Sequence, residues 1–438
     1  MIAGLFMMTG CVEEYEADLS KDEIHLLVVN GTICSNQRNQ FHLTWSTSLK
    51  KTSIDYLDAT PVVGAKVTIC GTDGTKYECT ESYMESNYTE EIDDGEEYYD
   101  GNDYYDGNDY YDGNDYYDGN DYYYGDENEN RDENEYKFGF YSCDLPELDP
   151  NVSYFLTIEC DKDVYQSTPE KPIRTPDIET LEYFQKDSLS DVEILLTTAA
   201  PDNPDETLYC TWDYNETWEV RPNRTTMLWF NPSSRKLEYL PGDKQFPKRG
   251  WMFGHNDSIF IESTVHYADG RFSKYQILHI PRDDERISWY YCHDIRQRAI
   301  SKAEYEYWIA VHLAGWKMGG LFTPQPSAFP SNIRCLTSSK RAIGYIGCAQ
   351  NIATKRIYVD GTKISRILPK PGPYAYLDDC DEDICVDMVN QGLVLFGWND
   401  GRPIFKKLET YWGYKEDFDV RLKGATTEKP DYMPPFDN

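Results

Sequence analysis

The sequence predicts a mainly β protein: an N-terminal immunoglobulin-like β-sandwich followed by a larger β-rich domain with one amphipathic helix. Short runs of β-branched and aromatic residues alternate with polar ones and are separated by frequent turn residues, which is typical of antiparallel strands. A convincing helical period occurs once. The chain of 438 residues is also too long for a single hydrophobic core, so two domains are expected.

The first domain is expected at residues 25–170. Strands are predicted where apolar residues alternate or run between turn signals such as Asn30-Gly31, at residues 25–31, 41–45, 62–69, 136–142, 154–159 and 164–167. Pro169, Pro172 and Pro176 favour extended backbone and predict a linker at residues 171–177.

The second domain is expected at residues 178–438. Its predicted strands cover residues 178–184, 192–197, 208–220, 227–230, 258–267, 275–280, 342–347, 356–359, 392–398 and 403–405. Ser301 and Glu304 form a capping box that begins a helix over residues 302–317. Helical spacing places one apolar face on the sheet, with His312 as a hydrogen-bonded core residue; the face comprises Tyr305, Trp308, Ile309, His312, Leu313 and Trp316.

The N-terminus resembles a bacterial lipoprotein signal. A short apolar run ends in Met8-Thr9-Gly10-Cys11, where small residues admit a signal peptidase and the thiol that follows is acylated. Residues 1–10 are then a signal peptide, and Cys11 is the lipidated first residue of the mature chain. Residues 11–24 are acidic and without pattern, which predicts a tether.

A low-complexity insertion interrupts the first domain at residues 85–135. It holds the sequence Tyr-Tyr-Asp-Gly-Asn-Asp four times in succession from residue 98, and the part from residue 98 onward lacks aliphatic residues to bury. The simplest interpretation is a disordered loop grown by repeat expansion. A weaker hypothesis is Ca²⁺ binding by oxygen ligands such as Asp100, Asn102, Asp103 and Asp106, although no EF-hand register is present. No other cofactor is expected.

The net charge of the chain limits which classes of molecule can be its partners. The formal net charge is −35, and the insertion alone carries 21 acidic residues against Arg131. So acidic a chain repels nucleic acid and anionic lipid headgroups, so neither is an expected partner. No apolar run after residue 10 approaches the ~20 residues that a membrane-spanning helix needs.

Twelve cysteines show no zinc-ligand spacing. Cys380 and Cys385 are close enough in sequence to close a small loop, Cys70 and Cys79 flank a predicted hairpin, and Cys143 and Cys160 fall on strands expected to be neighbours. An exported protein can form disulfides at such pairs. Buried thiols acting as small hydrophobic residues are the alternative.

No catalytic constellation is evident, and the chain is not expected to be an enzyme. The closest candidate, His293-Asp294, is more simply a surface pair. A ligand site for a glycan or peptide is possible around Trp212, Glu216, Trp218 and Trp289, because indole rings stack on ligands beside carboxylates. The alternative is that these tryptophans fill the β core.

Several segments together resemble one known family. They are Val28-Val29-Asn30-Gly31-Thr32-Ile33, Glu216-Thr217-Trp218-Glu219, Tyr305-Glu306-Tyr307-Trp308, Gly319-Gly320-Leu321-Phe322-Thr323-Pro324-Gln325-Pro326-Ser327 and Arg421-Leu422-Lys423-Gly424-Ala425-Thr426. Their pattern is similar to that of a Bacteroidota lipoprotein family known as domain of unknown function 4249 (DUF4249). Family tails often carry a cysteine pair before the Arg-Leu stretch, where this chain has residues 417–420 without cysteine, so that disulfide is absent here.

The resemblance implies an outer-membrane lipoprotein associated with TonB-dependent (Sus-type) transporters, an accessory or ligand-capture subunit in nutrient uptake. It implies no catalytic residues. Glu13, Glu14 and Glu16 resemble the signal that sends such lipoproteins to the cell surface. The expected partners are therefore a transporter, the outer membrane through the lipid anchor, and an unidentified glycan or peptide. The alternatives are a surface hydrolase of glycans or peptides and a structural adhesin.

Overall fold

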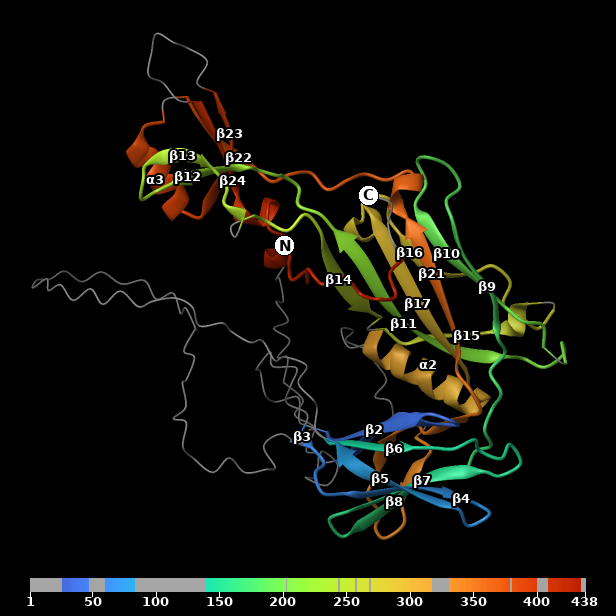
Figure 1. Cartoon of the computed structure of the whole chain (residues 1–438). Coiled ribbons are helices and arrows are strands. Elements are labelled where there is room, and N and C mark those ends of the chain that lie inside the picture. The colour runs from blue at the N-terminus through green and yellow to red at the C-terminus, as the bar shows by residue number, and fades with distance from the viewer. Residues whose placement is uncertain are drawn as a thin grey trace, which may run out of the picture.

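The computed structural model describes residues 26–46, 60–82, 139–316 (except 202, 243–244, 257 and 268), 331–399 (except 379) and 409–434. This part of the chain is mainly β, as predicted, and folds into three lobes (Figure 1). The predicted signal peptide, tether, Cys11 and Tyr/Asp insertion with its four Ca²⁺ candidates lie outside the described residues. No described helix is both long and apolar enough to span a membrane.

The first lobe is a sandwich made by one path of paired strands, ordered β18-β8-β7-β4-β5-β6-β2-β1-β19, with β20 on β1 and β3 on β2. The strands alternate between buried and more exposed residues, as a sheet with one face on the core requires; in β7, every second residue is buried. Its strands are β1 (Leu27–Cys34), β2 (Arg38–Trp45), β3 (Thr60–Pro61), β4 (Lys66–Gly71), β5 (Lys76–Ser82), β6 (Phe140–Asp144), β7 (Tyr154–Cys160), β8 (Asp163–Ser167), β18 (Ile333–Cys335), β19 (Ala342–Gly344) and β20 (Gly347–Ala349).

Three strands of this sandwich come from far along the chain. β19 and β20 pair in parallel with β1, and β18 pairs with β8. The sequence assigned residues 333–349 to the second domain, whereas they complete the first. Ile333, Ile346 and Cys348 join the core of the first lobe. The apolar surface that they bury offsets the entropy cost of bringing this distant segment back to the first lobe.

The second lobe is another sandwich. A sheet ordered β14-β11-β17-β21, with β15 on β11, packs against the sheet β16-β10-β9. The strands are β9 (Ile178–Phe184), β10 (Val192–Thr198), β11 (Tyr209–Val220), β14 (Gly250–His255), β15 (Phe260–Ser263), β16 (Tyr275–Ile280), β17 (Tyr290–Ala299) and β21 (Ala353–Asp360). The central strand β17 was not predicted, because His293 and Gln297 occupy buried positions where apolar residues were expected.

The predicted helix is α2 (Lys302–Trp316), and it lies between the two sandwiches (Figure 1). Ser301 caps it by accepting a hydrogen bond from the Glu304 amide at 3.1 Å, as predicted. The predicted apolar face is wrong in detail: Glu304 and Tyr307 are the buried residues, whereas His312 is exposed. The Glu304 carboxylate does not complete the capping box. It binds the Arg298 guanidinium instead, at 2.6 and 3.1 Å.

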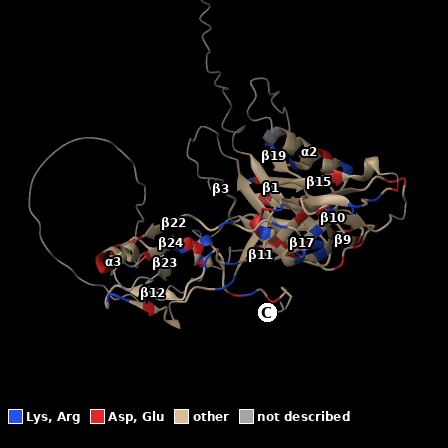
Figure 2. Cartoon of the chain, turned by 90° about the horizontal axis from the view of Figure 1, so that it is seen from above, with Lys and Arg blue, Asp and Glu red and all other residues tan. Residues whose placement is uncertain are grey.

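A third, small lobe is assembled from two excursions of the second sandwich. The hairpin β12 (Leu228–Asn231) and β13 (Lys236–Tyr239) packs with the sheet β22-β24-β23 and with helix α3 (Glu382–Asn390). The sheet strands are β22 (Tyr374–Leu377), β23 (Leu393–Asn399) and β24 (Glu409–Tyr414). Figure 2 shows acidic residues on α3, while basic and acidic residues lie side by side around β11 and β17.

The cysteine pairs differ from prediction. Cys380 and Cys385 are neighbours, with their sulfur atoms 2.7 Å apart at the start of α3, a helix that the sequence analysis missed. Cys70, however, lies opposite Lys76 and not opposite Cys79. Cys143 and Cys160 are on β6 and β7, which β4 and β5 separate in the sheet, so the predicted adjacency of their strands is wrong.

The linker between the sandwiches is a pair of strand-like segments held together. The Ile173 amide donates to the Cys348 carbonyl at 3.0 Å, and the Gln350 amide donates to the Ile173 carbonyl at 2.8 Å. The Asn351 side chain bonds both the amide and the carbonyl of Thr175, at 2.9 and 3.0 Å. The Thr175 hydroxyl donates to the Asn351 carbonyl at 2.7 Å and accepts from the Ala299 amide at 3.0 Å. Thr175 is buried, so these groups cannot turn to water instead.

We expect Thr175→Val to lower the free energy of unfolding by about 2 kcal/mol, because it leaves the buried Ala299 amide and the partly buried Asn351 carbonyl without their partner. Chemical denaturation of the purified protein measures this change. Thr180→Val, at an exposed position of β9, is the matched control and should stay within about 0.5 kcal/mol of the wild type. Equal stabilities of the two variants would contradict the role of the linker.

Candidate functional site

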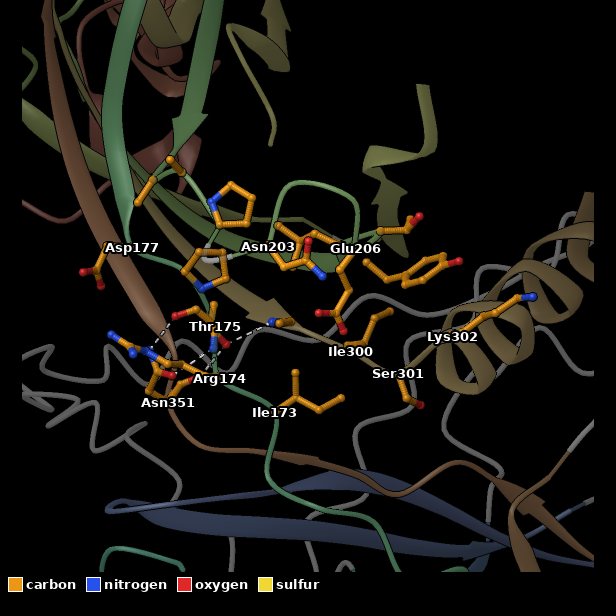
Figure 3. A pocket seen from close by; sticks show the side chains of 18 residues that line it. Ile173, Arg174, Thr175, Asp177, Asn203, Glu206, Ile300, Ser301, Lys302 and Asn351 are labelled. Carbon is orange, nitrogen blue, oxygen red and sulfur yellow. Dashed lines mark hydrogen bonds between the residues drawn. The ribbon is translucent and has the colours of Figure 1, made fainter. Parts of the chain in front are cut away.

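A pocket of about 650 Å³ opens beside this double linker, where the two sandwiches meet (Figure 3). Four segments contribute its walls: the linker, the turn that follows β10, the end of β17 with the start of α2, and Asn351. The lining residues are Ile173, Arg174, Thr175, Pro176, Asp177, Ala199, Ala200, Pro201, Asn203, Glu206, Thr207, Leu208, Tyr209, Ala299, Ile300, Ser301, Lys302 and Asn351. Its volume lies within the usual range for small-molecule sites, roughly 300–1,000 Å³.

Local turn chemistry shapes the wall that follows β10. The Asn203 side chain accepts from the Asp205 amide at 3.2 Å, and the Asn203 carbonyl accepts from the Glu206 amide at 3.2 Å. Leu208 then exchanges hydrogen bonds with Thr264, which returns the chain to β11. This turn holds Glu206 over the pocket, as Figure 3 shows.

The pocket combines apolar walls with a few polar groups of both signs. Ile173, Ile300 and Leu208 supply aliphatic surface, and Tyr209 supplies an aromatic ring. Glu206 and Lys302 are exposed and bring opposite charges. Such a lining suits a neutral polar ligand that has an apolar face, for example a sugar or a short peptide, better than a highly charged one.

A half-buried carboxyl group adjoins the pocket. The Glu170 carboxylate, at the start of the linker, accepts a hydrogen bond from the Tyr345 hydroxyl, which also lies 3.2 Å from the Ser301 hydroxyl. Burial raises the pKa of Glu170 to about 7, and the Tyr345 hydrogen bond opposes that shift. The linker, the start of α2 and the segment that carries Tyr345 therefore meet around the Glu170 carboxyl group.

The residues predicted as a ligand site lie elsewhere, in the second sandwich, and none of them lines the pocket. Trp212 is fully buried; its indole donates to Gln297 at 2.9 Å and packs on Phe272 and Tyr275. Trp218 is half-buried against the same core. For Trp212, the alternative of a core residue is what the structure shows.

Trp289 and Glu216 are both engaged within the chain. The Arg221 guanidinium covers the Trp289 ring at 3.7 Å from its centroid. Glu216 is buried, 2.7 Å from an Arg286 nitrogen and 2.5 Å from the Tyr291 hydroxyl. A carboxylate neutralised in this way is not presented to an external ligand in this conformation.

His293 is the largest departure from the predicted surface pair. Its side chain is fully buried on β17, where Nδ1 lies 3.1 Å from the Tyr291 hydroxyl and Nε2 meets no hydrogen-bond partner among the described residues. Burial, together with the nearby Arg286 charge, lowers the pKa of His293 to about 3, so the imidazole is neutral. Asp294 points away and pairs with Arg356.

A second surface with ligand-like chemistry lies on the third lobe. The rings of Tyr374, Tyr376, Phe396 and Tyr411 contact one another with centroids 5.1–6.1 Å apart, on the face of the sheet that points away from α3. Tyr374 and Tyr376 are about half exposed. Arg224 lies 4.6 Å from the Phe396 ring centroid, at the edge of this aromatic face.

The part of the chain that the structure describes contains no cluster of three or more metal-ligating side chains. The Asp/Asn hypothesis for Ca²⁺ concerns residues outside that part. The pocket itself escaped sequence reasoning because its residues come from a linker, a turn and a helix start. Their only sequence signal was the density of prolines around residues 172–204.

Fold and pocket define a mainly β protein of two joined sandwiches with a ligand-sized pocket at the junction. Within that class, the chain belongs to the family described as domain of unknown function (DUF4249), whose model matches residues 12–356. The match includes both sandwiches up to β21 and every residue that lines the pocket. No curated protein matches the chain.

The neutral, buried His293 predicts a pH-dependent stability. The unfolded chain binds a proton at the ordinary histidine pKa near 6.5, whereas the folded chain does so only near 3, so protonation favours unfolding. The contribution of the neutral His293 imidazole to the free energy of unfolding is present above pH 6.5 and is lost as the pH falls toward 3. It should amount to about 2 kcal/mol between pH 8 and pH 5.

Denaturation at both pH values tests this directly. We expect the loss of stability between pH 8 and pH 5 to be smaller in His293→Gln by about that amount. His266→Gln, at an exposed histidine, is the control and should keep the wild-type pH dependence. A His293→Gln profile parallel to the wild type would show that the imidazole is not held neutral.

Proposed function

We propose that this protein is a ligand-capture accessory of a TonB-dependent nutrient transporter, anchored by a lipid on Cys11 to the outer face of the outer membrane. The junction pocket is the observation that carries the proposal. It is large enough for a sugar ring or a short peptide, and its floor is rigidly hydrogen-bonded. Its residues also fall entirely within the family match.

The N-terminal sequence supports the place of action. Met8-Thr9-Gly10-Cys11 resembles a lipoprotein signal, and Glu13, Glu14 and Glu16 resemble the signal for surface export in Bacteroidota. The tether would let a soluble ligand-binding body reach a transporter in the same membrane. Family resemblance to transporter-associated lipoproteins of Bacteroidota supports the choice of partner.

A surface hydrolase is the less favoured function. Its sequence support was a carboxylate near tryptophans, and that carboxylate, Glu216, is paired with Arg286 at 2.7 Å. The neighbouring Glu219 is paired with Arg221 at 2.6 Å. Both carboxylates are also buried within the second sandwich. The adhesive role concerns the Tyr/Asp insertion, which lies outside the residues that the structure describes.

We expect Ala200→Trp to fill the pocket and to weaken ligand binding at least tenfold, because an indole would occupy the volume beside Tyr209. Binding of a panel of oligosaccharides and short peptides by calorimetry provides the measurement. Leu189→Trp adds the same side chain at an exposed position outside the pocket and should bind like the wild type.

Two results of this experiment would redirect the proposal. If Tyr376→Ala abolishes binding and Ala200→Trp does not, the aromatic face of the third lobe is the ligand site and the pocket is not. If mass spectrometry finds cleaved panel members after incubation with the wild type, the protein is a hydrolase.

Lipidation provides an independent test of the anchor. We expect Cys11→Ser to abolish incorporation of labelled palmitate and to release the protein from the membrane fraction, since acylation needs the thiol. Cys335→Ser, at a partly exposed cysteine of the first sandwich, should behave like the wild type. A tagged wild-type protein that co-purifies with no TonB-dependent transporter in mild detergent would contradict the proposed partner.

A further inference from the structure

Two cysteines face each other at the base of the Tyr/Asp insertion. β5 and β6 are antiparallel, with Thr80 opposite Ser142. The next pair, one position farther from the insertion, is therefore Cys79 opposite Cys143. Their sulfur atoms lie 2.7 Å apart, closer than two thiols approach in ordinary van der Waals contact. Directly opposed residues on neighbouring antiparallel strands have Cβ atoms about 4.5–5.5 Å apart, which is close to the about 3.5–4.5 Å separation in a disulfide.

The position of this pair in the chain is informative. Residues 83–139, which include the whole repeat, separate β5 from β6 in sequence. Only three residue pairs join the two strands, from Thr80–Ser142 to Ser82–Phe140. A pairing this short must offset the entropy of closing a long loop, and that cost grows as the repeat lengthens.

We propose that Cys79 and Cys143 form a disulfide that staples β5 to β6, so that the sandwich keeps its strand pairing whatever the length of the insertion. The inference rests on the proposed export, because such a bridge persists in an oxidising compartment. It gives the insertion a covalently closed base. The repeat can then expand or contract without loss of the first sandwich.

The chemistry is thiol–disulfide exchange. Either thiol of the pair can donate the hydrogen bond that joins the two sulfur atoms. With Cys79 as the donor, this bond lowers the pKa of the Cys143 thiol, which favours Cys143 as the attacking thiolate. Cys143 attacks the disulfide of a protein dithiol oxidase, and Cys79 then displaces the oxidase from the mixed disulfide. Two protons and two electrons leave the pair, and the oxidase departs as a dithiol.

Other cysteines of the first sandwich provide contrasts. Cys70 lies 3.8 Å from the Thr157 hydroxyl and opposite Lys76. Cys335 contacts hydroxyl groups of Thr337 and Ser338. In these contacts the partner of each sulfur atom is a hydroxyl oxygen, so both cysteines should remain thiols.

Peptide mapping of the full-length exported protein tests the bridge. The denatured protein is alkylated without reductant and digested with trypsin, which cuts after Lys76, Arg131, Lys137 and Lys162. Cys79 is then on peptide 77–131, whereas Cys143 and Cys160 are both on peptide 138–162, where fragmentation shows which of the two is linked and which is alkylated. We expect these two peptides to run as one linked species that reduction separates. Cys79→Ser should abolish the linked species and leave Cys143 alkylated, whereas Cys70→Ser should retain it.

The failure of the bridge and the failure of the proposed function are distinguishable. Protein that is lipidated on Cys11 but carries alkyl groups on both Cys79 and Cys143 would overturn the bridge and leave the function standing. If the protein proves not to be exported, the purified chain is treated with oxidised glutathione before mapping. Absence of the 77–131/138–162 species after that treatment would also overturn the pairing.

Discussion

The double linker is the interaction on which the remaining structure depends. Residues 171–177 leave the first sandwich, and residues 350–353 leave it a second time after β18–β20 have completed it. Thr175 and Asn351 bond these two crossings to each other and to Ala299 at the end of β17. Two crossings bonded side by side restrict hinge motion far more than one proline-rich strand would, and they supply the floor of the junction pocket.

Buried charge is the second organising feature. Arg298 and Glu304 join β17 to α2 with both side chains almost fully buried, and Glu216 pairs with Arg286 inside the second sandwich. Buried pairs of this kind add little net stability, since desolvation offsets their attraction, but they penalise any arrangement that separates the partners. The Arg298–Glu304 pair fixes how α2 meets β17 beside the pocket, whereas the Glu216–Arg286 pair lies away from it.

Sequence reasoning succeeded where the local pattern and the tertiary environment agree. β9 and β16 have the predicted bounds, and α2 ends within one residue of its prediction. It failed where partners distant in sequence satisfy a polar residue. β17 was missed because Gln297 is buried, yet its amide bonds both the Trp212 indole and the Pro176 carbonyl. The pocket was missed for a related reason, because its walls come from four separate segments.

The sequence by itself determined the β class, most strands, the capped helix and the family resemblance, because alternation, turn residues and capping act over a few neighbouring positions. Only the tertiary structure decided that β18–β20 belong to the first sandwich, that Trp212 is core, and that Cys79 meets Cys143 across a separation of 64 residues. Those outcomes depend on strand pairing between distant segments. A local pattern shows that a strand forms, but the burial gained by each possible neighbour selects its partner.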